Sequence, residues 1–211
     1  MHFLSSIVSF AAFSACIAPV ISVPIAEPTV QESSLDLLVK RNGALTTPAQ
    51  TCYNGVKSKC DEINAKIEAA VDAKIDVDLA AEIVADLKVI VDLVVKLGAD
   101  LKACISVGGL VVADVKACIK IVIAIVNLCA SIILKIAACL AVNVHISVFL
   151  AVVVQLKACL QVVIDLCVSI CLGKAGGLGV LDVVALVGLV VELTACLAAF
   201  VKACVSVGLN V

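Results

Sequence analysis

Aromatic and charged residues are scarce in this chain, and its charge and composition argue against two classes of protein. Aromatic residues make up 3% of the 211 residues, and tryptophan is absent. Charged residues make up 15%, against about 25% in a typical soluble domain. The net charge of −2 gives no electrostatic case for binding nucleic acid. The 64% of hydrophobic residues, mostly Val, Leu, Ile and Ala, excludes intrinsic disorder.

The sequence also lacks the motifs of catalytic and metal sites. His145 is the only histidine beyond the first residues of the chain, and no GxSxG nucleophile motif accompanies it. No CxxC pair is present, so zinc binding is a poor interpretation of the cysteines. The glycine-rich segment 173–179 lacks the Walker and GxGxxG patterns, as expected of a plain connector. We therefore predict no catalytic, cofactor-binding or metal-binding residues and no enzyme activity.

Residues 1–22 have the character of a secretory signal peptide. They are almost all apolar or small, contain no acidic residue and include Pro19, and Pro24 and Pro28 follow them. We expect cleavage near Ser22. The alternative is an uncleaved membrane anchor, which the prolines and the following polar segment disfavour.

Residues 23–41 resemble a propeptide. The segment is short and acidic, and it ends in the dibasic pair Lys40-Arg41, which contains the only arginine of the chain. Such a pair after a signal peptide indicates cleavage by a kexin-like protease, which makes residues 42–211 the predicted mature chain. The alternative is an exposed basic pair with no role in processing.

Charge divides the mature chain into two parts. Residues 42–100 hold 16 charged residues in 59, whereas residues 101–211 hold 11 in 111. The first part is typical of a soluble pair of helices, and the second approaches the composition of a membrane protein. We predict that the two parts form one domain.

The spacing of apolar residues predicts an all-α fold, a disulfide-stapled bundle of about five helices with a strongly aliphatic second part. Thr47 is expected to cap the first helix, with Pro48 at its first position. Glu62 and Lys66 are expected to pair across one turn. The expected helices run from Thr47 to about Val71, from Asp76 or Asp78 to about Val107, from about Leu110 to about Asn143, from about Ser147 to Cys171, and from about Leu181 to about Val207.

Two of these helices carry a narrow polar stripe on an otherwise apolar surface. The stripe residues are four or seven positions apart, so they share one helix face. The first stripe contains Lys116, Lys120, Asn127, Ser131 and Lys135, and the second contains Lys157, Gln161, Asp165 and Ser169.

Cysteine is unusually frequent, with twelve residues, of which Cys16 lies in the signal segment. In a secreted chain this density indicates disulfides, and an odd count of eleven leaves one thiol that is buried or pairs between chains. The cysteines recur at helical spacing, which predicts inward stripes that cross-link neighbouring helices. The alternative is that some of them are small buried apolar residues. The disulfide candidates are Cys52, Cys60, Cys104, Cys118, Cys129, Cys139, Cys159, Cys167, Cys171, Cys196 and Cys204.

A short motif recurs around four of the lysines. The sequence Leu-Lys-Ala-Cys-Ile-Ser-Val-Gly at 101–108 matches Val-Lys-Ala-Cys-Val-Ser-Val-Gly at 201–208 in six of eight positions. Lys102 and Cys104 lie about 200° apart on a helix, which places the cation outside and the thiol inside. The motif predicts a repeated stapling unit, and biased composition is the alternative.

Residues 136–156 carry no formal charge and are long enough to span a bilayer. Polar residues Asn143, His145 and Ser147 lie at the centre of this stretch, and the mature chain has too few aromatic residues for an interfacial belt. We therefore interpret the apolar helices as core helices of a bundle and keep a membrane span as the alternative.

The signal peptide, the Lys40-Arg41 pair, the many cysteines and the polar-then-aliphatic order resemble secreted structural proteins of filamentous basidiomycete fungi. That class coats aerial hyphae and substitutes for hydrophobins. The resemblance is architectural and covers the whole chain, and it implies a role in the cell wall or in coating a surface. The chain departs from hydrophobins themselves, since it contains no adjacent Cys-Cys pair.

These observations predict a secreted, extracellular, surface-active structural protein that coats or associates with the cell wall or a hydrophobic interface. Its expected partners are a hydrophobic interface, a cell-wall polymer or lipid, with self-association as a further possibility and no nucleic acid. The alternatives are a secreted carrier of lipid or sterol, which requires an enclosed apolar cavity, and a membrane-inserting helical protein.

Overall fold

The computed structural model describes residues 44–70, 74–107, 110–140, 144, 146–172, 180–206 and 208–209. In the last helix the side chains are described from Leu186 onward. The predicted signal peptide, the predicted propeptide with Lys40 and Arg41, His145 and the glycine-rich segment 173–179 lie outside the described residues.

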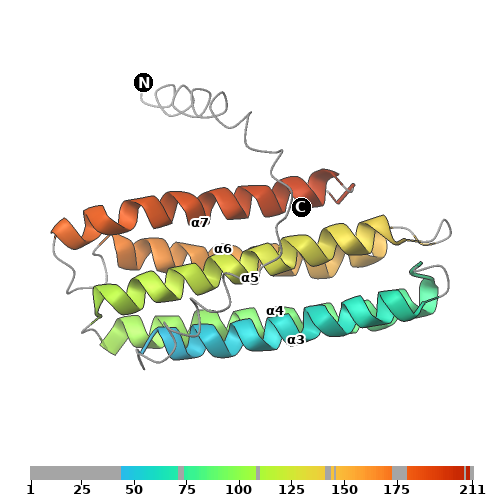
Figure 1. Cartoon of the computed structure of the whole chain (residues 1–211), viewed down its shortest axis with the longest axis horizontal. Helices are drawn as coiled ribbons and strands as arrows, with labels where there is room; N and C mark the ends of the chain where they lie inside the picture. The colour runs from blue at the N-terminus through green and yellow to red at the C-terminus, as the bar shows by residue number, and fades with distance from the viewer. Residues whose placement is uncertain are drawn as a thin grey trace, which may run out of the picture. The chain divides into compact units, whose positions relative to one another are not determined.

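The described part of the chain is an all-α bundle, as predicted. Five long helices run along one common direction, and the fourth is preceded by a short 3₁₀ helix (Figure 1). The elements are α3 (Thr46–Ala69), α4 (Val77–Val107), α5 (Val112–Ala138), η3 (Ile146–Phe149), α6 (Leu150–Cys171) and α7 (Val180–Ser206).

The start of α3 differs from the prediction. Thr46 is the first helical residue and Leu45 precedes it as the N-cap, without a side-chain hydrogen bond to the helix. Thr47 is therefore inside the helix, and Pro48 occupies the third position of the first turn. Proline is tolerated there because the first N–H groups of a helix have no helical partner. Burial of Leu45 explains the earlier start, since Leu45 is fully buried.

The start of α4 agrees with the sequence. The backbone N–H of Leu79 donates to Asp76 Oδ1 at 2.9 Å, so Asp76 is the cap. The bond satisfies an N–H group at the start of α4, which packs directly against α3.

The five helices pack as a ring of neighbours around a shared aliphatic core. α3 packs against α4 and α5, α7 packs against α5 and α6, and α4 packs against α6. α5 is the helix most deeply enclosed, with 13 of its 27 residues buried. Its buried set is rich in isoleucine, including Ile119, Ile121, Ile125 and Ile132. Removal of these branched side chains from water is the main stabilising contribution in such a core.

The uncharged stretch 136–156 is not one continuous helix. α5 ends at Ala138, an isolated bridge joins Ile75 to Leu140, and η3 begins at Ile146. The third helix was expected to reach about Asn143 but ends at Ala138, and Ser147 already lies in η3, while residues 141–143 and 145 are outside the described part of the chain. Burial of Phe149 at the end of η3 anchors the chain as it enters α6.

Candidate functional site

The polar side chains of the bundle concentrate between α3 and α4. Lys66 Nζ lies 2.8 Å from Asp86 Oδ2 and 3.3 Å from Glu82 Oε2, and Lys59 Nζ lies 3.5 Å from Asp86 Oδ1. Lys59 also pairs with Glu62 on its own helix. The prediction that Lys66 pairs with Glu62 is wrong, because Lys66 reaches across to α4 while Lys59 takes the Glu62 carboxylate.

This network places an ion pair at an almost fully buried position. Asp86 is 8% exposed, and two ammonium groups face its carboxylate. Hydrogen bonds from the Lys66 ammonium to the carboxylates of Asp86 and Glu82 raise the pKa of Lys66 above its usual value. A buried carboxylate with two cationic partners is satisfied, so we interpret the network as a tie between α3 and α4.

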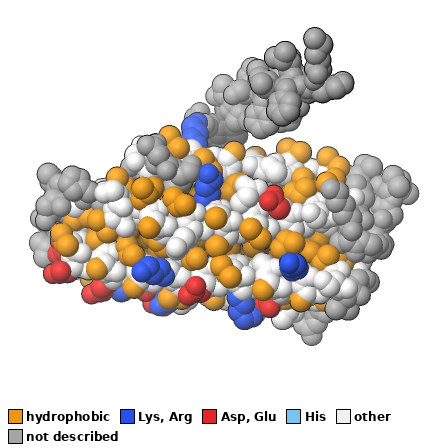
Figure 2. Space-filling model, turned by 180° about the vertical axis from the view of Figure 1, so that it is seen from behind, with side chains coloured by type: hydrophobic (Ala, Val, Ile, Leu, Met, Phe, Trp, Pro, Cys, Tyr) orange, Lys and Arg blue, Asp and Glu red, His pale blue; other side chains and the backbone are white. Residues whose placement is uncertain are grey.

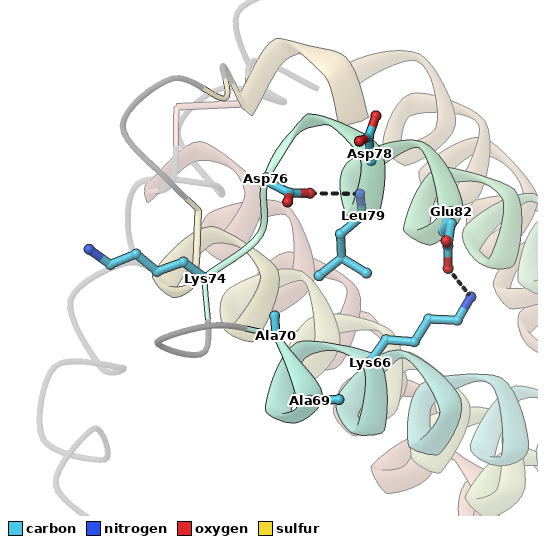
Figure 3. Close-up of a pocket in the computed structure, with 8 residues that line it drawn as sticks. All are labelled: Lys66, Ala69, Ala70, Lys74, Asp76, Asp78, Leu79 and Glu82. Carbon is cyan, nitrogen blue, oxygen red and sulfur yellow. Dashed lines mark hydrogen bonds and ion pairs between the residues drawn. The ribbon is translucent and has the colours of Figure 1, made fainter.

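An open pocket of about 600 Å³ lies at the turn between the same two helices (Figure 3). Lys66 and Glu82 pair along one wall, and the Asp76 carboxylate is turned toward the backbone N–H of Leu79. The side chain of Lys74 points away from this pair. Three polar side chains of the pocket, Lys66, Glu82 and Asp76, are thus engaged with other groups of α3 and α4. Nowhere in the described residues do three or more His, Cys, Asp or Glu side chains gather as a metal site.

Exposed large apolar side chains occur on α4, on η3 and α6, and on α7, among the residues that the structure describes. Three helical segments are long and apolar enough to cross a membrane by length and composition, Val112–Ala138, Ile146–Cys171 and Leu186–Ser206. The bundle buries 61% of the first apolar window, but only 33% of the second and 22% of the third. The last two helices therefore bury a smaller share of their apolar windows than α5 does.

Exposed valines mark these outer faces. Val187, Val191 and Val205 are 4 and 14 positions apart, so they share one side of α7, and Val154 and Val162 of α6 are 8 positions apart, about 80° around the helix. Those of η3 and α6 are Val148, Val154 and Val162, and those of α7 are Val187, Val191 and Val205. Figure 2 shows the same division, with hydrophobic side chains over much of the visible face and the acidic side chains mainly along its lower edge.

The polar stripes predicted on two of the helices lie on the outside of the bundle. Lys120, Asn127 and Ser131 of α5 are exposed, and so are Gln161 and Asp165 of α6. Gln161 Nε2 donates to Asp165 Oδ1 at 2.8 Å, which spans one turn of α6. The stripes face solvent and lie beside apolar side chains. The outer surface of α6 is therefore partly polar and partly apolar.

A second, apolar groove of about 390 Å³ lies between α4 and α6. Val94, Val95 and Ala99 contribute one wall, and Val162 and Leu166 contribute the other. Gly98 lies at its base, where an added Cβ would be 3.7 Å from Val163. Lys102 is the charged residue of the lining. Sequence reasoning missed this groove, and the available signal was a glycine inside the apolar run of a 31-residue helix.

The eleven described cysteines are free thiols in the structure, so the predicted disulfide staples are not confirmed. The prediction that the cysteines face the interior of the bundle is confirmed for those that are buried. The buried cysteines are Cys52, Cys60, Cys118, Cys129, Cys167, Cys171 and Cys204, and the half-buried ones are Cys104, Cys139, Cys159 and Cys196.

Two groups of thiols come together across helices. The Cys118 thiol of α5 forms a hydrogen bond with Cys167 of α6, and Cys104 and Cys171 lie near enough to interact electrostatically with Cys118. Cys129 of α5 interacts in the same way with Cys60 and Cys52 of α3.

Burial disfavours the ionised form of these thiols and so raises their pKa values. Burial, followed by the charge of Asp100, raises the pKa of Cys52 to about 12. Burial raises the pKa of Cys60 to about 12 as well, with a smaller contribution from Asp61. The pKa of Cys118 is raised by its hydrogen bond with Cys167 and by burial. None of these thiols has the lowered pKa that a nucleophilic cysteine requires.

The comparisons with protein-family models, with curated proteins and with solved structures found no match to this chain.

Proposed function

We propose that this protein is a secreted, surface-active structural protein that adsorbs to hydrophobic interfaces through the outer faces of α6 and α7. The observation that carries the proposal is the poor burial of these two helices, 33% and 22% of their most apolar windows. Large exposed apolar faces are unusual on soluble monomers and are typical of surfaces that meet another apolar phase.

The opposite side of the bundle supports the same proposal. α3 and α4 carry the ion pairs, among them Lys57–Asp61, Lys96–Asp100 and the network around Asp86. The charged side chains of α3 and α4 keep the molecule dissolved and the apolar faces of α6 and α7 adsorb, although α4 also exposes Val77, Val89 and Val95. The fungal resemblance and the predicted signal peptide are consistent with a coating of the cell wall, in which copies of the chain associate through the same faces.

Membrane insertion is the second candidate function, and the three helices apolar enough to span a bilayer favour it. It requires α5 to leave its present neighbours, because 61% of its apolar window is buried inside the bundle. Adsorption requires no such rearrangement, since the apolar faces of α6 and α7 are already outside. We therefore place adsorption first.

Surface tension and vesicle leakage separate the two functions. Adsorption predicts that the mature protein lowers the surface tension of water while its helical circular dichroism is retained. It also predicts no release of dye from lipid vesicles. Dye release at similar protein concentrations, with little surface activity, would favour membrane insertion.

A further inference from the structure

We propose that the groove between α4 and α6 binds one single-chain amphiphile with an anionic head group. The site goes beyond adsorption at an interface, because it holds one molecule at a defined place. Its volume of about 390 Å³ lies within the range of about 300–1,000 Å³ that is usual for small-molecule sites. The lining offers valine, leucine and alanine side chains along its length, which suits an alkyl chain.

Gly98 creates the space for that chain. Glycine in the middle of a helix lowers its stability by about 1 kcal/mol relative to alanine. No close contact at Gly98 requires the missing side chain, since an added Cβ would meet Val163 at 3.7 Å and Val162 at 4.0 Å, which are ordinary packing distances. The consequence of the glycine is therefore an open base to the groove.

Charge fixes the chemistry and direction of the ligand. Lys102 is exposed at the groove and forms no ion pair within the part of the chain that the structure describes. No acidic residue lines the groove. Two acids near the lining have partners, since Asp100 pairs with Lys96 at 2.7 Å and Asp165 accepts a hydrogen bond from Gln161 at 2.8 Å. The charge of Asp92 helps to raise the pKa of Cys159, after burial, and Asp92 is about 15 Å from Lys102 along α4, so an anionic head group is favoured at the Lys102 end.

The chain itself offers matched controls for both features. Gly188 lies in α7 and has nothing within 4 Å of an added Cβ, so it is a helical glycine outside the groove. Lys202 occupies in α7 the position that Lys102 occupies in α4, because both stand in the repeated Lys-Ala-Cys motif. Cys196 is a half-buried thiol of α7, as Cys159 is of the groove.

The experiment is calorimetric titration of the full chain with decanoate below its micelle concentration, with decanol as the uncharged probe. Wild type is expected to bind one decanoate saturably. Gly98→Leu is expected to abolish binding, while Gly188→Leu leaves it unchanged. Lys102→Gln is expected to weaken the binding of decanoate about fivefold and to leave the binding of decanol unchanged. Lys202→Gln is expected to change the affinity for neither probe.

Two measurements keep the proposal testable if Gly98→Leu folds poorly. Gly98→Ala fits the available space, so it is expected to raise the unfolding midpoint and to weaken decanoate binding. Decanoate is also expected to slow maleimide labelling of Cys159 in the reduced protein, with no effect on Cys196. Non-saturable uptake, equal binding by Gly98→Leu, or equal protection of both thiols would overturn the proposal. Val162 belongs both to the groove and to the exposed face of α6, but no residue of α7 lines the groove, so Gly98→Leu is expected to leave adsorption through α7 unchanged.

Discussion

Lys66 Nζ on α3 lies 2.8 Å from Asp86 Oδ2 on α4, and the carboxylate it contacts is almost entirely buried. Thr46 and Asp86 are the buried polar residues among those described, and Asp86 is the charged one. The buried charged tie of the bundle is thus placed between its first two helices, and the more exposed pair Lys135–Glu68 joins α5 to α3, whereas α5, α6 and α7 are held to one another by aliphatic packing.

Removal of the Asp86 carboxylate should destabilise the bundle. Asp86→Ala leaves the ammonium groups of Lys59 and Lys66 without their shared partner, and we expect a loss of about 1–3 kcal/mol in the free energy of unfolding. Asp61→Ala is the control, because Asp61 is exposed and pairs with Lys57 at 3.4 Å within one helix. That change should cost no more than about 0.5 kcal/mol. Denaturant unfolding of both variants decides, and equal losses would contradict a special role for Asp86.

The buried thiols of α3 predict a loss of stability in alkali for the reduced protein. The pKa of Cys52 and of Cys60 is about 12 in the folded chain, against 9.0 for an ordinary thiol. Between these values the unfolded chain has fewer bound protons than the folded one, so the stabilisation is complete below pH 9 and is lost as the pH rises toward 12. At pH 10.5 each thiol should account for about 2 kcal/mol.

The measurement is denaturant unfolding of reduced protein at pH 7.5 and pH 10.5. The double variant Cys52→Ala, Cys60→Ala should show a smaller decrease than wild type. Cys139→Ala is the control, because Cys139 is only half-buried. An equal decrease in wild type and in the double variant would show that these two thiols do not cause the loss.

The contact between Cys118 and Cys167 predicts the first staple to form. The two thiols are hydrogen-bonded and buried on different helices, so molecular oxygen or a disulfide exchange partner that oxidises the protein should join α5 to α6 at this pair. Such a bridge is worth about 2–4 kcal/mol, chiefly by restricting the unfolded chain.

Peptide mapping without reduction tests this pairing. We expect the peptide with Cys118 to be linked to the one with Cys167, and Cys167→Ser to leave Cys118 as a free thiol. Cys171 lies one turn beyond Cys167 and should then take a different partner. A majority of free thiols in protein from the culture medium would contradict the stapled bundle.

Processing at Lys40-Arg41 predicts that the secreted chain begins at Asn42. N-terminal sequencing of protein from the culture medium tests this directly. A change of Arg41 to Ala should retain the propeptide and move the observed start to near Val23. A wild-type start near Val23 would remove the propeptide from the account.

Helix number and several boundaries could be predicted because local signals mark them strongly, whereas the end of α5 at Ala138 came earlier than expected. Asp76 caps α4 as its position suggests, and α4 ends at Val107 beside two glycines. The start of α3 could not be predicted, since burial of Leu45 is a tertiary effect that overrides the cap preference of Thr47. The partner of Lys66 could not be predicted either, because it depends on how α3 and α4 lie against each other.

The candidate surfaces, too, could be predicted only in part. The charge split along the chain predicted one aliphatic part, but it did not distinguish α5, which is enclosed, from α7, which is exposed. All three helices have similar compositions, and only their places in the bundle decide which apolar faces remain outside. The groove at Gly98 arises from the packing of α6 against α4 and has no separate motif.

The central claim is that the outer face of α7 drives adsorption, and two matched double variants address it. Val187→Lys with Val191→Lys places two charges on this face. Val77→Lys with Val89→Lys places the same charges at exposed valines of α4. Each buried valine contributes roughly 1 kcal/mol at about 25 cal/mol per Å², so the α7 variant should bind a hydrophobic surface at least about tenfold more weakly.

The deciding measurement is a binding isotherm of wild type and the two variants on Teflon-like beads at low and high salt, with circular dichroism alongside. The account predicts that wild type and the α4 variant bind alike, that the α7 variant binds weakly while it remains helical, and that salt has little effect because charge does not drive adsorption. Wild type that stays in solution, binding that collapses in high salt, or equal weakening of the two variants would contradict it.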